Sequence, residues 1–143
     1  MLLVLLMVLL LSFLTVGRGL VRSAQKAWLF SYVERHQEEL RAYAEDVYGN
    51  WEPSGREAVR YQNRWLVSWD QHSGLVKFQV TYCGFGSEST ERSFCYAPDG
   101  EVVFEGIKSS PTEESGRYFY GEGDNWVFCQ PIVEHWFWVE QHW

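Results

Sequence analysis

The sequence begins with an apolar run that divides the chain into two parts. Residues 2–16 read LLVLLMVLLLSFLTV, and only Ser12 and Thr15 interrupt the apolar side chains, without adding charge. Leucines would fall on every side of a helix formed by this run, unlike the one-sided pattern of a helix packed on a soluble core. The sequence therefore predicts a membrane anchor or signal segment at residues 1–22 and a separate soluble domain at residues 23–143.

The apolar run is shorter than an ordinary membrane span. A span needs about 20 apolar residues, with a lower range near 17, so the run crosses a bilayer only if residues 17–21 extend it while Arg18 and Arg22 snorkel to the surface. An apolar region of about 7–15 residues is also typical of a cleaved signal peptide, which would leave a secreted domain. We expect an anchor first, a cleaved signal second and a buried core helix third.

The two parts of the chain also differ in net charge. Residues 1–28 hold three basic residues and no acid, whereas residues 29–143 hold nine basic and nineteen acidic residues, which gives a net charge of −10. Basic residues after an apolar run favour a domain that stays in the cytoplasm. An acidic domain repels phosphate backbones, so the sequence predicts no binding to nucleic acid.

The spacing of apolar residues changes from helical to strand-like near residue 60. Apolar residues recur every three or four positions within residues 23–48, and Gly49 and Asn50 indicate the end of this helix. Residues 75–83 alternate with a period of two, and residues 72–74 indicate a hairpin turn before them. Further strands are expected at residues 65–69, 92–96, 102–104, 118–120 and 132–140. This order predicts an α+β fold, with an N-terminal membrane or signal helix, one amphipathic helix and a curved antiparallel sheet of about five or six strands.

The three cysteines, Cys83, Cys95 and Cys129, leave two interpretations open. No pair has the CxxC spacing of zinc ribbons or thioredoxin-type redox sites. Cys83 and Cys95 fall on neighbouring predicted strands, so a disulfide between them is one interpretation for a domain outside the cytoplasm. The other interpretation, which we favour, is three small buried side chains.

Candidate catalytic and metal sites in the sequence are weak. Glu122 and Asp124 in the segment GEGDN could bind Ca²⁺, but the six to eight oxygens of such a site are not in evidence, so a plain turn is favoured. Glu134, Glu140 and His142 share one face of the last predicted strand, but residues six apart on a strand, such as Glu134 and Glu140, lie about 20 Å apart. No motif of a known hydrolase, metalloprotease or P-loop enzyme is present. The sequence therefore predicts no enzyme activity, no metal and no cofactor.

Eight tryptophans are the remaining functional signal. Exposed aromatic rings on a sheet bind sugars or partner proteins, whereas buried rings fill the core. We favour the core for most of them. The residues that we nominate as a ligand or partner surface are Trp126, Trp136, Trp138, Glu122 and Asp124.

Several short blocks in residues 75–143 occur in a characteristic order. The blocks are CGFG at 83–86, FCYAPDG at 94–100, FEG at 104–106, GEGDN at 121–125 and WFWVE at 136–140. In order and spacing they resemble a group of small uncharacterised proteins of Clostridia-type gut bacteria that carry one N-terminal membrane segment. The resemblance implies a domain on the outer side of the membrane, against the orientation that the basic residues favour. It implies no activity and carries over no catalytic residue.

The sequence as a whole predicts a non-catalytic interaction or sensing domain that is tethered to a membrane through residues 2–16. Its partner, whether a protein or a glycan, is not identified by the sequence. The second hypothesis is a glycan- or cell-wall-binding module that uses exposed tryptophans. The third is an enzyme of unknown type.

Overall fold

The computed structural model describes residues 2–50, 59–85, 88–104, 116–119 and 124–143. Among the first 18 residues it describes the side chains of Met7 and Gly17 only. The chain divides into two compact units, Met1–Arg35 and His36–Trp143.

One helix, α1 (Leu2–Asn50), runs through the first unit and into the second. At His36 the backbone leaves helical geometry, with φ −117° and ψ 17°, so α1 is two helical segments joined at a kink. The predicted helix at residues 23–48 is therefore present, and it continues into the apolar run without a break at residue 22. Within the side chains that the structure describes, no helix has a stretch long and apolar enough to cross a membrane.

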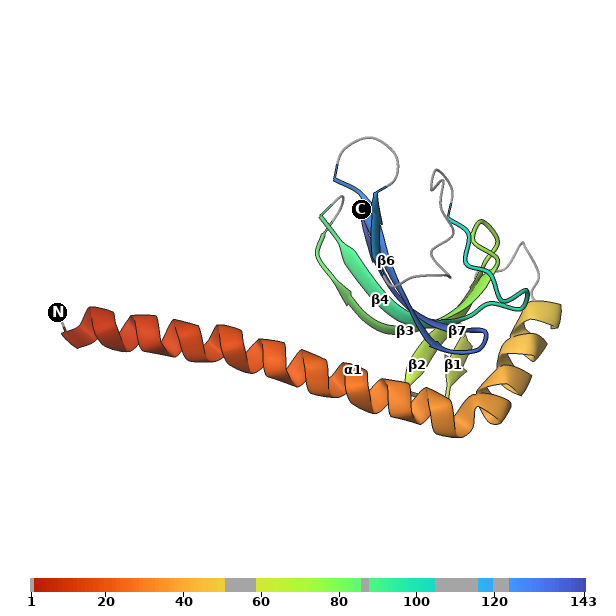
Figure 1. Cartoon of the computed structure of the whole chain (residues 1–143), viewed down its shortest axis with the longest axis horizontal. Coiled ribbons are helices and arrows are strands. Elements are labelled where there is room, and N and C mark those ends of the chain that lie inside the picture. The colour runs from red at the N-terminus through yellow and green to blue at the C-terminus, as the bar shows by residue number, and fades with distance from the viewer. Residues whose placement is uncertain (1, 51–58, 86–87, 105–115, 120–123) are drawn as a thin grey trace. The chain divides into compact units, whose positions relative to one another are not determined.

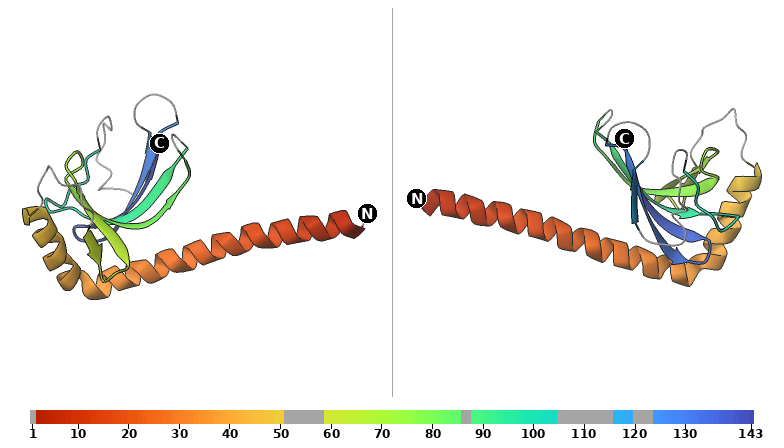
Figure 2. Two further views of the ribbon diagram at one scale, coloured as in Figure 1. Left: turned by 180° about the vertical axis from the view of Figure 1, so that it is seen from behind. Right: turned by 45° about the horizontal axis from the view of Figure 1, so that its top comes forward.

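The second unit contains one seven-stranded antiparallel sheet that curves strongly (Figures 1 and 2). Its order is β1-β2-β3-β4-β7-β6-β5, so the last strand along the chain lies in the middle of the sheet. The strands are β1 (Val59–Tyr61), β2 (Trp65–Asp70), β3 (Leu75–Cys83), β4 (Thr90–Tyr96), β5 (Gly116–Phe119), β6 (Trp126–Val133) and β7 (Trp136–His142). The α+β class and the antiparallel sheet are confirmed, with seven strands in place of the expected five or six.

Two predicted strands were wrong. The strand expected at residues 132–140 is divided by a turn at Glu134 and His135, and the two halves pair as β6 and β7. His135 has a φ of 65°, which non-glycine residues rarely adopt. Two hydrogen bonds to Ala97 hold it there, because the His135 carbonyl accepts from Ala97 N at 2.9 Å and its Nδ1 lies 3.0 Å from the Ala97 carbonyl. The other error is residues 102–104, which form no strand.

The sheet has an apolar core on each face. On the face toward the second segment of α1, Phe78 and Phe94 stack with ring centroids 4.7 Å apart, and Trp65 meets Phe94 edge-on at 5.0 Å. Tyr43 of the helix lies over Phe78, with 6.2 Å between centroids. The predicted stripe residues Leu40, Ala44 and Val47 are buried in this unit. On the opposite face a second buried cluster consists of Leu75, Cys95, Ala97, Val102, Phe104, Val127, Cys129, Phe137 and Val139.

Candidate functional site

The structure corrects the surface that the tryptophans were expected to form. Trp136 and Trp138 are only 1% and 4% exposed, because the face that carries them packs in the aromatic core. Neither can form part of a partner surface. Trp126 is partly exposed and Asp124 is exposed, while Glu122 lies outside the described residues.

Trp126 is the register partner of His142, and Asp124 lies beside His142, so both lie at the end of the sheet where the C-terminus also lies. The strand register aligns four residues in a row across this end, Cys83, Thr90, His142 and Trp126, from β3, β4, β7 and β6 respectively. Because directly opposite residues on neighbouring strands project from the same face, their side chains share one face. The sheet therefore brings together segments that are far apart in the sequence.

A cluster of potential metal ligands forms at this end of the sheet. One donor atom each of Glu88, Asp124 and His142 lies within 4.8 Å of the other two. His142 Nε2 lies 3.8 Å from Asp124 Oδ2. Glu88 and Asp124 are exposed, and His142 is partly buried. From the sequence, Asp124 was grouped with Glu122, and His142 with Glu134 and Glu140, whereas Glu88 was not predicted as a ligand.

The imidazole of His142 is held in one orientation by its neighbours. Its Nδ1 lies 3.0 Å from the hydroxyl oxygen of Thr90. Its ring stacks on the indole of Trp126, with centroids 5.5 Å apart and planes 18° from parallel. With Nδ1 engaged by Thr90, Nε2 is the nitrogen that faces the carboxylate of Asp124.

Glu88 is held close to the sheet by a tight turn after β3. Gly84 has a φ of 115°, and a Cβ atom at this position would lie only 2.1 Å from the carbonyl oxygen of Glu88. Only glycine fits there without a backbone shift. On the other side of Glu88, the carbonyl of Ser89 accepts a hydrogen bond from Trp143 N at 3.1 Å. These contacts attach the start of β4 to the end of β7.

Glu140 and Glu134, which the sequence analysis considered with His142, have other roles. Glu140 accepts hydrogen bonds from Arg92 Nε and from Trp138 Nε1, each at 2.9 Å. Glu134 lies in the turn between β6 and β7, at the opposite end of β7 from His142. Glu134, Glu140 and His142 therefore do not form one site, as expected from the distance between them along a strand.

The same end of the sheet exposes large aromatic side chains. Tyr82, Phe85 and Phe119 are 56%, 94% and 66% exposed. Tyr82 lies 6.5 Å from Trp143 between ring centroids, and Phe119 is the register partner of Trp126. By register, Phe119 projects on the face that carries Trp126 and His142, whereas Tyr82 pairs with Glu91 and projects on the opposite face, so exposed rings lie on both faces at this end of the sheet. Exposed large apolar side chains are typical of interaction sites. We call this region the open-end surface; its residues are Tyr82, Phe85, Glu88, Phe119, Asp124, Trp126, His142 and Trp143.

The indole of Trp126 is contacted from both neighbouring strands. The guanidinium of Arg117 on β5 lies 4.0 Å from the Trp126 ring centroid, and His142 on β7 stacks on the same indole. Both contacts are with its π system, which stabilises the cation and the stacked ring. Little of the ring face is left for a sugar.

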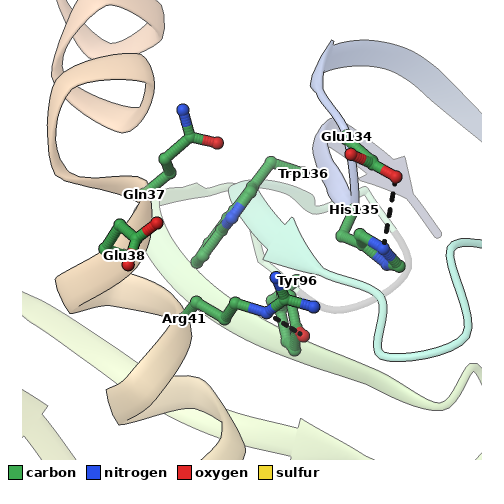
Figure 3. Close-up of a pocket in the computed structure, with 7 residues that line it drawn as sticks. All are labelled: Gln37, Glu38, Arg41, Tyr96, Glu134, His135 and Trp136. Carbon is green, nitrogen blue, oxygen red and sulfur yellow. Dashed lines mark hydrogen bonds and ion pairs between the residues drawn. The ribbon is translucent and has the colours of Figure 1, made fainter.

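A small pocket lies between the second segment of α1 and the turn that joins β6 to β7 (Figure 3). Its volume is about 50 Å³, and its lining residues are Gln37, Glu38, Arg41, Tyr96, Glu134, His135 and Trp136. Sites for small organic ligands usually measure about 300–1,000 Å³. The pocket therefore has room for water rather than for a substrate.

The polar groups beside this pocket join the helix to the sheet. Arg41 Nε donates to Tyr96 Oη at 3.2 Å and to Glu45 at 3.0 Å, and Tyr96 Oη donates to Glu45 at 3.0 Å. Burial, followed by the hydrogen bond to Glu45, raises the pKa of Tyr96. The hydrogen bonds from Tyr96 and Arg41 lower the pKa of Glu45. The three groups satisfy one another, which indicates a structural role.

A buried ion pair lies on the other face of the sheet. Lys77 Nζ lies 2.7 Å from Asp70 Oδ2, with the two side chains 11% and 25% exposed. Burial lowers the pKa of Lys77, but the carboxylate of Asp70 outweighs this effect and the pKa is raised. Burial raises the pKa of Asp70, but the charge of Lys77 and the hydrogen bonds that the carboxylate accepts together outweigh burial, so the pKa is lowered.

All three cysteines are free, and the disulfide between Cys83 and Cys95 is excluded. Cys83 pairs with Thr90, whereas Cys95 pairs with Lys77 near the other end of the hairpin. Five residues along a strand separate Thr90 from Cys95, which is about 17 Å and far beyond the reach of a disulfide. Cys95 and Cys129 are buried as expected, and Cys83 is exposed.

Comparison with family models, with curated proteins and with solved structures finds no match to this chain.

Proposed function

We propose that this protein is a non-catalytic binding domain, tethered to a membrane through residues 2–16, that contacts a protein partner through its open-end surface. The observation that carries the proposal is the position of Tyr82, Phe85 and Phe119. All three are more than half exposed at one end of a sheet whose other aromatic rings are largely buried. Exposed aromatic residues are the side chains that most often anchor protein interfaces.

A protein partner accounts for this surface better than a glycan. Glycan-binding modules use the free face of an aromatic ring, but Arg117 and His142 occupy the indole of Trp126. Trp136 and Trp138, the other tryptophans nominated for sugar binding, are buried. Residues 29–143 carry a net charge of −10, so electrostatic steering favours a partner with a basic surface around an apolar centre.

The non-catalytic part of the proposal rests on what the titratable groups contact. Lys77 pairs with Asp70, Arg92 pairs with Glu140, and Arg41 joins Glu45. The first two pairs each join neighbouring strands of the sheet, and the third joins successive turns of α1. Contacts of this kind stabilise the fold. The pocket of about 50 Å³ beside Arg41 is too small to take a substrate.

The tether is supported by the composition of residues 2–16, which contain no charged side chain. We place the domain outside the cytoplasm, as the resemblance of residues 75–143 implies. Glu134 offers a position to test this, because its side chain is 91% exposed and lies away from the open-end surface. In a Cys83→Ser background, Glu134→Cys is expected to react with a membrane-impermeant thiol reagent in intact cells. Reaction only after lysis would place the domain in the cytoplasm.

The size of the protein in native membranes tests the binding role. Membranes from the native host are dissolved in mild detergent and separated by native electrophoresis. The wild-type chain of 16.8 kDa is expected to migrate in a discrete larger complex. The double variant Phe85→Ser, Phe119→Ser is expected to be absent from this complex and to migrate at a smaller size. It removes two exposed aromatic side chains without changing the core.

Val59→Ser is the matched control, since Val59 is 49% exposed on β1, at the opposite edge of the sheet from β5. It is expected to leave the complex unchanged. The proposal is wrong if the wild-type chain migrates as an isolated monomer, or if the double variant and Val59→Ser behave alike.

A further inference from the structure

We propose that Glu88, Asp124 and His142 bind one divalent transition-metal ion, with Zn²⁺ as the representative ion. This inference goes beyond the binding role and does not depend on it, because metal binding is measured on the purified chain. Three donors from separate segments, one nitrogen and two carboxylates, lie within 4.8 Å of one another. Zinc sites with three protein ligands use such mixed nitrogen and oxygen donors.

The distances leave only a small movement for binding. Zn²⁺ binds nitrogen and oxygen donors at about 2.0–2.2 Å, which places the donors about 3.4 Å apart in a tetrahedron. His142 Nε2 and Asp124 Oδ2 are already 3.8 Å apart. Glu88 and Asp124 are exposed side chains on flexible stems, so rotation about their side-chain bonds closes the remaining gap without moving the strands.

His142 is already oriented as a metal ligand. In most metal sites the histidine nitrogen that does not bind the metal is hydrogen-bonded to a nearby oxygen, which fixes the ring. Here Nδ1 lies 3.0 Å from Thr90 Oγ1, and the stacked indole of Trp126 restrains the ring plane. Nε2 therefore presents its lone pair toward the two carboxylates when Nδ1 carries the proton.

The donor set selects among metals. Ca²⁺ and Mg²⁺ prefer oxygen donors only, and a histidine nitrogen disfavours them. Imidazole with carboxylates suits Zn²⁺, Mn²⁺, Co²⁺ and Ni²⁺. Two carboxylates also balance the charge of one divalent cation. With three protein ligands, one coordination position remains open for water or for a donor from a partner.

A bound ion would join three parts of the open-end surface. Glu88 precedes β4, Asp124 precedes β6, and His142 ends β7. β7 lies between β4 and β6 in the sheet, so Glu88 and Asp124 approach each other across the end of β7. The ion would therefore act as a cross-link that holds the segments around Phe85 and Trp126 in one arrangement.

Calorimetric titration of the full chain in non-ionic detergent with Zn²⁺ tests the site, together with Co²⁺ titration followed by its visible absorption. All samples carry Cys83→Ser, because the exposed thiol of Cys83 would otherwise be a competing ligand. We expect saturation at one ion per chain. Glu88→Gln and Asp124→Asn are each expected to weaken binding at least about 10-fold, since changes to the less direct partners of metal sites already cost 10–100-fold.

Two further variants distinguish a built site from general attraction to an acidic protein. Glu134→Gln removes an exposed carboxylate elsewhere and is expected to bind Zn²⁺ as the parent does. Thr90→Val removes the hydroxyl beside His142 Nδ1 and is expected to weaken binding while the stoichiometry stays at one. The proposal is overturned if no saturable one-to-one binding occurs, or if Glu88→Gln and Asp124→Asn bind as tightly as Glu134→Gln.

Discussion

The imidazole of His142 stacks on the indole of Trp126, with ring centroids 5.5 Å apart and planes 18° from parallel. This contact links β7 to β6 at the end of the sheet where the exposed aromatic residues lie. Trp136 begins the same strand β7 and has a different role, because it is 1% exposed and packs against Phe94 and Tyr96. One end of β7 therefore belongs to the core, and the other end belongs to a surface.

This division predicts unequal effects of removing the two tryptophans. Trp136→Ala leaves a cavity in the aromatic core and is expected to lower the free energy of unfolding by about 3–5 kcal/mol. Trp126→Ala removes surface contacts with His142 and Arg117 and is expected to cost about 1–2 kcal/mol. Urea unfolding of the full chain in detergent, followed by circular dichroism, measures both. Equal losses would contradict the assignment of Trp126 to the surface.

The ion pair of Lys77 and Asp70 predicts that removing the carboxylate lowers the free energy of unfolding. Asp70→Asn leaves the ammonium group of Lys77 buried without its carboxylate, which costs about 3 kcal/mol at neutral pH. Asp99→Asn is the control, because Asp99 is an exposed aspartate in a turn; its effect is expected to stay within about 0.5 kcal/mol. A loss for Asp70→Asn no larger than that for Asp99→Asn would contradict the role of the pair.

The difference in unfolding free energy between the wild type and Asp70→Asn depends on pH through the pKa shifts of Asp70 and Lys77. The pKa of Asp70 is lowered from 3.8, so its stabilisation is present above that pH and is lost as pH falls through the folded pKa. The pKa of Lys77 is raised from 10.5, so its stabilisation is present below that pH and is lost as pH rises through the folded pKa. The difference in unfolding free energy between wild type and Asp70→Asn is therefore expected to be constant near neutrality and to shrink in strong acid.

The burial of the cysteines predicts that a thiol reagent modifies one thiol per folded chain. Cys83 is exposed, whereas Cys95 and Cys129 are buried. Burial raises the pKa of both buried thiols, that of Cys129 to about 12, so neither forms the reactive thiolate at pH 8. A colorimetric thiol reagent at pH 8 is expected to modify one thiol in the folded protein and three in urea. Two or more modified thiols before unfolding would contradict this packing.

Periodicity in the sequence located the helix and β3 correctly, even though both faces of the first half of β3 are buried. Residues 75–83 alternate in the sequence and form β3, and the stripe through Leu40, Ala44 and Val47 faces the core of the second unit. The strand expected at residues 132–140 failed for a reason outside its own sequence. No glycine interrupts that run, and the turn exists because His135 takes a positive φ that contacts with Ala97 stabilise.

The candidate metal site could not be predicted from local sequence patterns. Asp124 and His142 were each considered, but with neighbours in the sequence rather than with each other. Their meeting depends on β7 entering the sheet between β4 and β6, which no local pattern specifies. Glu88 had no sequence signal, because it is a single exposed acid in the segment between two predicted strands.

Site-specific photo-cross-linking in living cells tests the central claim most directly. A photoreactive phenylalanine analogue replaces Phe85, which is 94% exposed on the open-end surface, and in a separate strain replaces Val59 on β1. The account predicts one discrete cross-linked protein from position 85 and none from position 59. Cross-linking to the same products from both positions, or no protein product from position 85, would contradict it.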